Sequence, residues 1–398
     1  MSKITVLRGS EAERSPFLRG ILVQSLVNAG LSFAEAYELA RHVRDELQDT
    51  VEITSHRLRE TVADLLEARH GGALRHAYEA RPQQEPGIIV HTPTRSAPFS
   101  AGILSHSLEA CGISPEVALR GAQKVYASLK QTGHREIDHR ALRRVIHRCL
   151  NEHCSSDVAD RYLSWRRFEN SGDALIVLVG GTTGTGKSTV SAELAYRLNI
   201  SRSQSTDMMR EIIRAYLSPQ VVPTLGYPSF EAWRGLPGSI EGQSLDIENL
   251  VIAGFQSQFA AMKLALEATI NRAIRERQHL IVEGVHVVPT ELSLDTRNHN
   301  AILVPMKLAV MKKSLLRKQL KRRDQESGSG ANSRRLVKLE DIWELQSWLL
   351  SEADRAGIPI IQNWYIEDTV RDALEHVTKV IMKHYPPQVP DTEDAVWH

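Results

Sequence analysis

The sequence of 398 residues predicts an α/β protein, with a doubly wound parallel sheet in the C-terminal half and two small, mainly helical repeats before it. Three observations predict this. A segment of the N-terminal half recurs, apolar strand-like runs alternate with amphipathic helical runs after residue 170, and a glycine-rich turn joins the first strand to its helix. The chain is too long to fold around a single hydrophobic core, and we expect domains over residues 1–85, 86–170 and 171–398.

The repeat is visible by self-comparison. Residues 16–31 read PFLRGILVQSLVNAGL, and residues 98–113 read PFSAGILSHSLEACGI. The register continues after a small gap, because Glu52–Ile53 match Glu136–Ile137 and Tyr78 matches Tyr162. One copy is therefore about 82–84 residues long, which is enough for a small domain.

Each copy is expected to be mainly helical. In the first copy the expected helices are Ser15–Asn28, a run from the cap residue Ser32 through Leu47, and Thr54 to about Ala68, where Gly71–Gly72 follow. In the second copy, Ser114 and Pro115 are expected as cap and first helical residue. The join between the copies carries a short strand candidate, Ile88–Val90.

The pattern changes after a linker expected at Glu169–Asp173. Ala174–Val179 is a continuous apolar run, as in a strand buried on both faces of a parallel sheet. A helix is expected from Lys187 to about Arg197. Further strands are expected at Leu280–Val282, Ile302–Val304 and Ile358–Ile361.

The turn after the first strand matches GxxxxGK[ST]. Its residues are Gly181, Thr182, Thr183, Gly184, Thr185, Gly186, Lys187 and Ser188, with Thr189 behind them. A buried strand before this motif and a helix after it are the setting of a P-loop, whose backbone N–H groups surround phosphate oxygens. We therefore expect ATP to bind here, with Lys187 at the β- and γ-phosphates and the Ser188 hydroxyl on Mg²⁺.

A carboxylate is expected beside this loop. Glu283 ends the strand LIVEG, and ligands of parallel sheets bind at the carboxyl ends of the strands. It is a candidate to hold Mg²⁺ through water or to polarise the attacking group; the alternative is an ordinary acid at a strand end. His286, two residues beyond LIVEG, is a candidate donor to a substrate phosphate, the alternative being a structural histidine.

The acceptor side is expected in SQSTDMMREIIR, residues 203–214. Asp207 follows a short polar strand end, where a carboxylate orients and deprotonates an acceptor hydroxyl. Arg210 and Arg214 lie one helical turn apart and suit an anionic substrate. The alternative is Asp207 as helix N-cap, with both arginines as solvated charges.

Two further segments are expected to cover the site. Ser218–Gly242 is rich in Pro and Gly and contains Tyr227, Phe230 and Trp233, which favours a substrate-side loop that excludes water. A basic run after residue 311 continues through a Ser/Gly-rich stretch, and is typical of a lid that closes over phosphates or of a solvated helix face. Its arginines are Arg317, Arg322, Arg323, Arg334 and Arg335, of which Arg322 is the expected catalytic group and Arg334 a substrate ligand.

Composition narrows the function classes. With 49 basic and 48 acidic residues the net charge is +1, which argues against a dedicated nucleic-acid protein. No run reaches the ~20 apolar residues of a membrane span, and the N-terminus has no secretory signal. The three cysteines are expected to be reduced thiols in a cytoplasmic protein.

The C-terminal half resembles the 2-phosphoglycerate kinases. The similar segments, in order, are VGGTTGTGKST, STDMMREIIR, LIVEGVHVVP and IPIIQNW–IEDTV. This resemblance implies a P-loop kinase-type fold and ATP-dependent phosphorylation of 2-phosphoglycerate to 2,3-bisphosphoglycerate. The lid region departs from the family pattern by the Ser/Gly insertion Glu326–Asn332.

The N-terminal copies resemble ATP-cone domains, the first over residues 3–80 and the second, more loosely, over 88–167. That resemblance implies nucleotide sensing, and Arg8–Gly9 is the matching basic start of the first copy, where the second has Thr94–Arg95–Ser96. The alternative is a structural or homo-oligomerising module.

The first hypothesis is thus an ATP- and Mg²⁺-dependent kinase of a small phosphorylated molecule. The open alternatives are another acceptor such as an inositol phosphate, an ATP-sensing protein without transfer, and a polynucleotide-end kinase. Asp207 and Glu283 beside an intact Lys187 favour catalysis over sensing.

Overall fold

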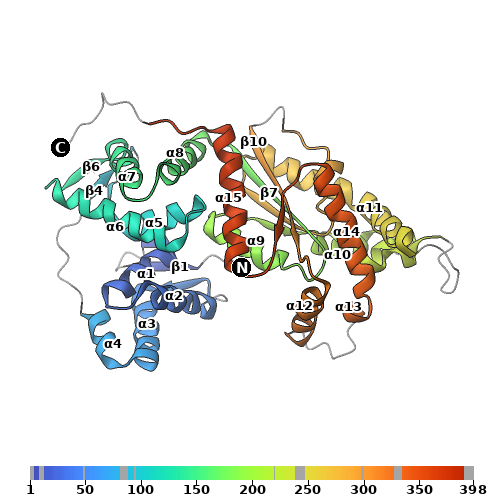
Figure 1. Cartoon of the computed structure of the whole chain (residues 1–398), viewed down its shortest axis with the longest axis horizontal. Helices are drawn as coiled ribbons and strands as arrows, with labels where there is room; N and C mark the ends of the chain where they lie inside the picture. The colour runs from blue at the N-terminus through green and yellow to red at the C-terminus, as the bar shows by residue number, and fades with distance from the viewer. Residues whose placement is uncertain are drawn as a thin grey trace. The chain divides into compact units, whose positions relative to one another are not determined.

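The computed structural model divides the chain into two units (Figure 1). The described residues are 4–8, 13–47, 50–80, 88–93, 96–133, 135–218, 220–237, 247–296, 300–326 and 334–389. Phe168–His384 form the second unit, and the described residues before and after it form the first. The finer division of the first unit into domains 1–85 and 86–170 stays a prediction.

The first unit contains the same succession of elements twice. The first copy has β1 (Thr5–Arg8), β2 (Glu13–Pro16), α1 (Arg19–Asn28), α2 (Phe33–Glu46), β3 (Glu52–Thr54), α3 (Ser55–His70) and α4 (Gly72–Glu79). The second has β4 (Ile89–His91), β5 (Ser96–Pro98), α5 (Ala101–Ala110), α6 (Pro115–Gln131), β6 (Glu136–Asp138), α7 (His139–His153) and α8 (Ser156–Ser171). This order confirms the internal repeat read from the sequence.

Each copy has a small three-stranded sheet of the same topology. In the first, β1 pairs antiparallel with β2 and parallel with β3. In the second, β4 pairs in the same way with β5 and β6. The sequence missed β2: the helix expected at Ser15–Asn28 begins only at Arg19, because a residue before proline, here Ser15, favours extended backbone.

The helices of these copies begin where their cap residues predict. Ser32 forms a capping box with Glu35, and the Thr54 side chain accepts a hydrogen bond from the Arg57 N–H. α6 begins at Pro115, as expected. Apolar faces of the first copy pack into a common core that includes Leu26, Leu39, Val43, Val62 and Leu66.

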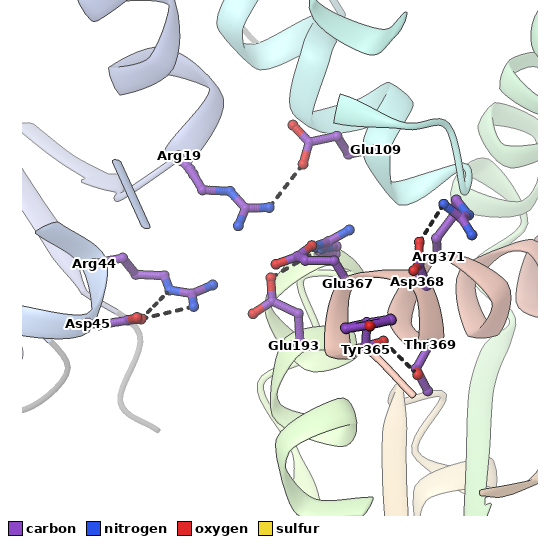
Figure 2. Close-up of polar contacts among 11 residues, drawn as sticks. Arg19, Arg44, Asp45, Glu109, Glu193, Tyr365, Glu367, Asp368, Thr369 and Arg371 are labelled. Atoms are coloured by element: carbon purple, nitrogen blue, oxygen red, sulfur yellow. Dashed lines mark hydrogen bonds and ion pairs between the residues drawn. The ribbon is translucent and has the colours of Figure 1, made fainter. Parts of the chain in front are cut away.

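The two copies meet through α1 and α5. A Cβ placed on Gly20 would lie 2.6 Å from the Gly102 carbonyl oxygen, so the two backbones approach as closely as glycine allows. Beside this contact, the Arg19 guanidinium donates to Glu109 at 3.1 Å, and both side chains are buried (Figure 2). Apolar contact and an ion pair thus join the copies into one unit.

The second unit is built on a parallel sheet of five strands. The order is β11 (Ile360–Gln362), β10 (Ala301–Ala309), β7 (Ala174–Gly180), β9 (Leu280–Gly284) and β8 (Ser203–Ser205). All four pairings are parallel, which confirms the predicted sheet. The linker expected at Glu169–Asp173 is wrong in part, because α8 continues through Ser171 and the helix ends before Gly172.

Helices cover both faces of this sheet (Figure 1). On one side lie α9 (Lys187–Arg197) and α15 (Ile366–His384), and on the other lie α11 (Ile247–Arg275) and α14 (Leu339–Arg355). Ile176 and Leu178 of β7 pack against Phe255 and Met262 of α11 in the larger core. The remaining elements are α10 (Thr206–Tyr216), η1 (Pro223–Gly226), η2 (Ser229–Gly235), η3 (Pro289–Glu291), α12 (Lys313–Glu326) and α13 (Arg334–Val337).

A buried arginine ties α9 to α15. The Arg197 side chain, 3% exposed, pairs with Glu193 at 3.2 Å and with Glu367 at 2.6 Å; both glutamates are labelled in Figure 2. Charge-assisted bonds of this kind hold a helix in a fixed position when they are shielded from water. In the part of the chain that the structure describes, no helix combines the length and the apolar character that a membrane crossing requires.

Candidate active site

The glycine-rich turn has the backbone of a phosphate-binding loop. Gly181, Gly184 and Gly186 all have positive φ angles, and Gly186 is the residue before the first turn of α9. In this conformation the N–H groups of the loop and of the α9 N-terminus converge on one point, where an anion is favoured. Thr182 and Thr185 are buried in the loop, whereas Ser188 and Thr189 are exposed on α9.

The turn after β11 supports this loop. The Asn363 side-chain amide donates to the Thr185 carbonyl at 2.9 Å, and the Thr369 hydroxyl contacts the Asn363 carbonyl oxygen at 3.0 Å. A Cβ on Gly186 would lie 2.2 Å from the Asn363 amide nitrogen. Sequence analysis did not single out Asn363; its position directly after a strand end was the available signal.

Lys187, Ser188 and Glu283 lie together at the carboxyl ends of β7 and β9. The Lys187 ammonium donates to the Thr182 carbonyl at 2.8 Å, and the Ser188 hydroxyl to Glu283 Oε1 at 3.1 Å. Burial lowers the pKa of Lys187, while the carboxylates of Glu283 and Asp207 act in the opposite direction. The loop thus places one hydroxyl and one carboxylate beside its lysine.

A second lysine lies beneath the loop, and sequence analysis missed it. Lys307 of β10 pairs in register with Gly180 and is 1% exposed; its ammonium group donates to the Val287 carbonyl. Burial, with a smaller contribution from the charge of Lys187, lowers the pKa of Lys307 to about 7. A lysine inside an apolar strand pattern was the one signal in the sequence.

The acceptor-side residues follow β8, next to β9 in the sheet. The Ser205 side chain accepts a hydrogen bond from the Asp207 N–H, so Ser205 is the N-cap of α10 and the alternative of Asp207 as N-cap is wrong. Asp207 therefore keeps an exposed carboxylate at the sheet edge. Arg210 is largely buried and donates to the Tyr227 carbonyl at 2.7 Å, whereas Arg214 is exposed and pairs with Glu211 at 2.6 Å.

A cavity of about 330 Å³ joins part of these groups; Ser188, Glu283 and Arg214 do not line it. It brings the P-loop together with Asp207 and Arg210, as expected from the sequence. Its polar lining is Thr182, Thr183, Lys187, Asp207, Arg210, Ser229, Arg323 and Arg335, and its apolar lining is Pro228, Phe230, Val285, Ile342 and Leu345. Cations and one carboxylate thus face a space with apolar walls.

Of the three aromatic residues in the loop expected to cover the substrate, Phe230 alone lines the cavity. Pro228, Ser229 and Phe230 line the cavity, whereas Tyr227 and Trp233 do not. Tyr227 instead lies 6.0 Å from the Arg234 guanidinium, and Trp233 lies 5.5 Å from the Lys338 ammonium. The end of the predicted loop, including Gly238 and Gly242, lies outside the described residues.

His286 is fully buried and does not line the cavity. Its Nδ1 lies 3.2 Å from Thr206 Oγ1, its Nε2 lies 2.9 Å from Gln258 Oε1, and its ring stacks on Phe255. Burial lowers the pKa of His286 to about 3, so the imidazole is neutral at physiological pH. The structure thus places it behind the cavity wall.

The basic helix after β10, α12, brings Arg323 to the cavity instead of the expected Arg322. Arg323 of α12 and Arg335 of α13 line the cavity, whereas Arg322 does not. One residue along a helix turns the side chain by about 100°. The side chain of Arg334 and most of the expected insertion Glu326–Asn332 lie outside the described residues.

The arrangement suits transfer between two anions. The P-loop and Lys187 can hold a nucleotide triphosphate, and Ser188 with Glu283 fits a Mg²⁺ ion that takes its other ligands from phosphate oxygens and water. Arg210, Arg323 and Arg335 line the same cavity and provide positive charge that can attract a second anion.

No protein-family model matches the chain. A 2-phosphoglycerate kinase of Pyrococcus furiosus is 34% identical over 289 residues, which are 72% of this chain and 92% of the relative. The 2-phosphoglycerate kinase of Methanocaldococcus jannaschii is 34% identical over 292 residues, and that of Methanopyrus kandleri 32% over 305, each covering 91% of the relative. With about a third of the aligned residues identical over nine tenths of the length of these proteins, the chain belongs to the 2-phosphoglycerate kinase family.

Proposed function

We propose that this chain transfers the γ-phosphoryl group of ATP to the free hydroxyl of 2-phosphoglycerate, giving 2,3-bisphosphoglycerate and ADP. The observation that carries the proposal is the single cavity that joins Lys187 of the P-loop to Asp207 and Arg210. The names of the archaeal relatives support the same acceptor. Three free thiols, at Cys111, Cys149 and Cys154, support a reducing, cytoplasmic setting.

In the proposed reaction, the acceptor hydroxyl oxygen forms a bond to the γ-phosphorus as the bond to the β-phosphate oxygen breaks. Asp207, exposed in the cavity, orients that hydroxyl and takes its proton. Lys187 and the loop N–H groups stabilise the charge that spreads over the transferring oxygens. Mg²⁺, held by Ser188 and Glu283, would neutralise charge on the phosphates.

The remaining lining of the cavity suits the acceptor. 2-Phosphoglycerate carries a carboxylate and a phosphate, and Arg210, Arg323 and Arg335 provide cations for both. Phe230, Ile342 and Leu345 limit the access of water, which would otherwise compete as acceptor.

The test is an acceptor screen followed by ³¹P NMR. With Mg²⁺ and ATP, we expect 2-phosphoglycerate to give 2,3-bisphosphoglycerate and an equal amount of ADP. Preferential phosphorylation of an inositol phosphate would replace the acceptor but keep the kinase assignment. ATP binding without any transfer would contradict the kinase and favour the nucleotide sensor.

For the first unit we propose an ATP-cone-like regulatory role, with nucleotide bound by the first copy. The alternative role of this unit is self-association of chains. Support comes from the sequence resemblance and from the repeated element order. Gly9 and the side chain of Arg8 lie outside the described residues. Equilibrium dialysis tests this role: more than one ATP bound per chain is expected, and light scattering reports the mass of the assembly.

A further inference from the structure

His286 and its partners form a buried polar network behind the acceptor side of the cavity. Thr206, Gln258 and His286 are all 0% exposed, and they come from α10, α11 and the turn after β9. Buried polar groups are retained where every donor and acceptor is satisfied, and such a network fixes the elements that it joins.

The hydrogen bonds of Gln258 determine the direction of the network. Its side-chain nitrogen donates to the Thr224 carbonyl at 2.6 Å and to the Tyr227 carbonyl at 2.9 Å. Its Oε1 therefore faces His286, whose Nε2 must carry the hydrogen of that 2.9 Å bond. In a neutral imidazole the Nδ1 is then an acceptor, and the Thr206 hydroxyl donates to it.

At one end the network holds the residue that precedes Asp207. A Cβ on Gly284 would lie 1.8 Å from Thr206 Oγ1, so the end of β9 leaves Thr206 room only because residue 284 is glycine. Gly284 has a φ of 149°, which side chains rarely adopt. Thr206, and with it the start of α10, is thereby fixed against β9 and His286.

At the other end the network holds the loop that lines the cavity. Gln258 binds the carbonyls of Thr224 and Tyr227, which come just before Pro228, Ser229 and Phe230 of the cavity wall. Arg210 donates to the same Tyr227 carbonyl at 2.7 Å. Ser229 Oγ lies 3.5 Å from His286 Nε2. Both ends of the network therefore reach residues that line the cavity.

We propose that His286 is a positioning residue: through Thr206 and Gln258 it fixes Asp207, Arg210 and the Ser229–Phe230 wall in the geometry that the acceptor requires. The proposal rests on the proposed function, because it assigns this wall to the acceptor. It predicts a selective effect, since the hydrogen bonds of Thr206, Gln258 and His286 link these residues to one another and to the loop of Thr224, Tyr227 and Ser229 rather than to the P-loop.

Two variants break the network at different bonds. Gln258→Glu keeps the side-chain shape but turns an oxygen towards the two carbonyls, and His286→Asn removes the donor to Gln258. The matched control is His279→Asn: His279 also lies against a phenylalanine ring, that of Phe168 at 5.6 Å between centroids, and its Nδ1 accepts a hydrogen bond from the Leu175 N–H outside the cavity.

The steady-state test measures kcat and the KM for 2-phosphoglycerate, together with the Kd of a non-hydrolysable ATP analogue. We expect kcat/KM for 2-phosphoglycerate to fall by about tenfold or more in both variants, because misplacement by ~1 Å can cost about 10²-fold. The Kd of the analogue should stay within about twofold, and the control should change neither quantity. An unchanged kcat/KM, or an equal loss in both quantities, would overturn the proposal.

A measurement on the unaltered protein tests the network even if the variants fail to fold. In ¹⁵N-labelled protein, the His286 ring should show the neutral tautomer with hydrogen on Nε2 throughout pH 5–8. Hydrogen on Nδ1, or an imidazolium signal in that range, would overturn the network. If the unaltered enzyme failed to phosphorylate 2-phosphoglycerate, the proposed function alone would fall, and this spectrum would still test the network.

Discussion

At the scale of single residues, the site buries two lysines, Lys187 of the phosphate-binding loop and Lys307 beneath it. Burying an ammonium group has a large cost in free energy. Burial lowers the pKa of Lys187, and burial followed by repulsion from Lys187 lowers that of Lys307 to about 7. A buried ammonium loses its hydration and is retained only where an anion or a carbonyl replaces it. We expect the triphosphate of the proposed nucleotide to supply that anion, so the site should favour polyanions.

Burial of Lys307 should make the free energy of unfolding depend measurably on pH. Its pKa is about 7 in the folded protein against 10.5 ordinarily, so between these values the unfolded chain binds a proton that the folded protein has released. Its contribution to stability therefore rises as the pH rises through this window. Against Lys307→Met, the free energy of unfolding of the unaltered protein should gain about 3 kcal/mol from pH 7 to pH 9.5, measured by urea denaturation. Parallel pH curves for the two proteins would contradict this.

At the scale of elements, the loop depends on the turn between β11 and α15. Asn363 holds the Thr185 carbonyl and packs against Gly186, and Thr369 of α15 holds Asn363 in turn. α15 is itself tied to α9 through Arg197 and Glu367. The loop is therefore supported by β11 and α15, which contribute no residue to the lining of the cavity.

Asn363→Ala tests this support. Without the amide, the loop carbonyl loses a buried hydrogen bond worth about 1–1.5 kcal/mol, so we expect the Kd for ATP to rise roughly tenfold. The KM for 2-phosphoglycerate should stay the same, because the acceptor wall lies on other elements. Calorimetric titration with an ATP analogue measures the first quantity.

A matched control is Asn271→Ala, because Asn271 also holds a loop, through Ser293 and Asp295, but lines no part of the cavity. It should leave ATP binding unchanged. Equal weakening in both variants would point to general loosening of the domain.

The elements themselves were largely predictable, for local reasons. α9 begins at Lys187 and ends at Arg197 as expected, and Ser32 and Pro115 mark helix starts. The errors are also local in origin. The missed strand β2 has only four residues, too few to show a period, and α8 continues over polar residues that resemble a linker.

The site was predictable where a motif fixes the backbone, and less so where tertiary contacts decide. The P-loop, Asp207 and Arg210 line one cavity, as expected. Arg323 rather than Arg322 faces it, because helix rotation depends on packing that the sequence does not display. Lys307 acquires its importance from Gly180 and Val287, which are distant in sequence.

At the scale of the whole molecule, the relatives match more than the domain that contains the cavity. The aligned 289 residues outnumber those of Phe168–His384, so the similarity reaches into the first unit, while more than a quarter of this chain stays outside the match. The cavity, by contrast, is lined only by residues of the second unit.

Deletion of residues 1–167 tests this separation. Because the cavity and the larger core belong to the second unit, we expect a soluble fragment whose kcat stays within about threefold of the full chain. Circular dichroism and the kinase assay report fold and activity. A folded but inactive fragment would assign the first unit to the catalytic machinery.

Asp207 and Lys187 line one cavity, and in the proposed function the Asp207 carboxylate acts on the acceptor. Single-turnover transfer in Asp207→Asn, with ATP binding measured alongside, tests this role. We predict that the transfer rate falls by about 10²-fold or more while the Kd for ATP changes by less than about twofold. Transfer at the unaltered rate, or a parallel loss of ATP binding, would contradict this role.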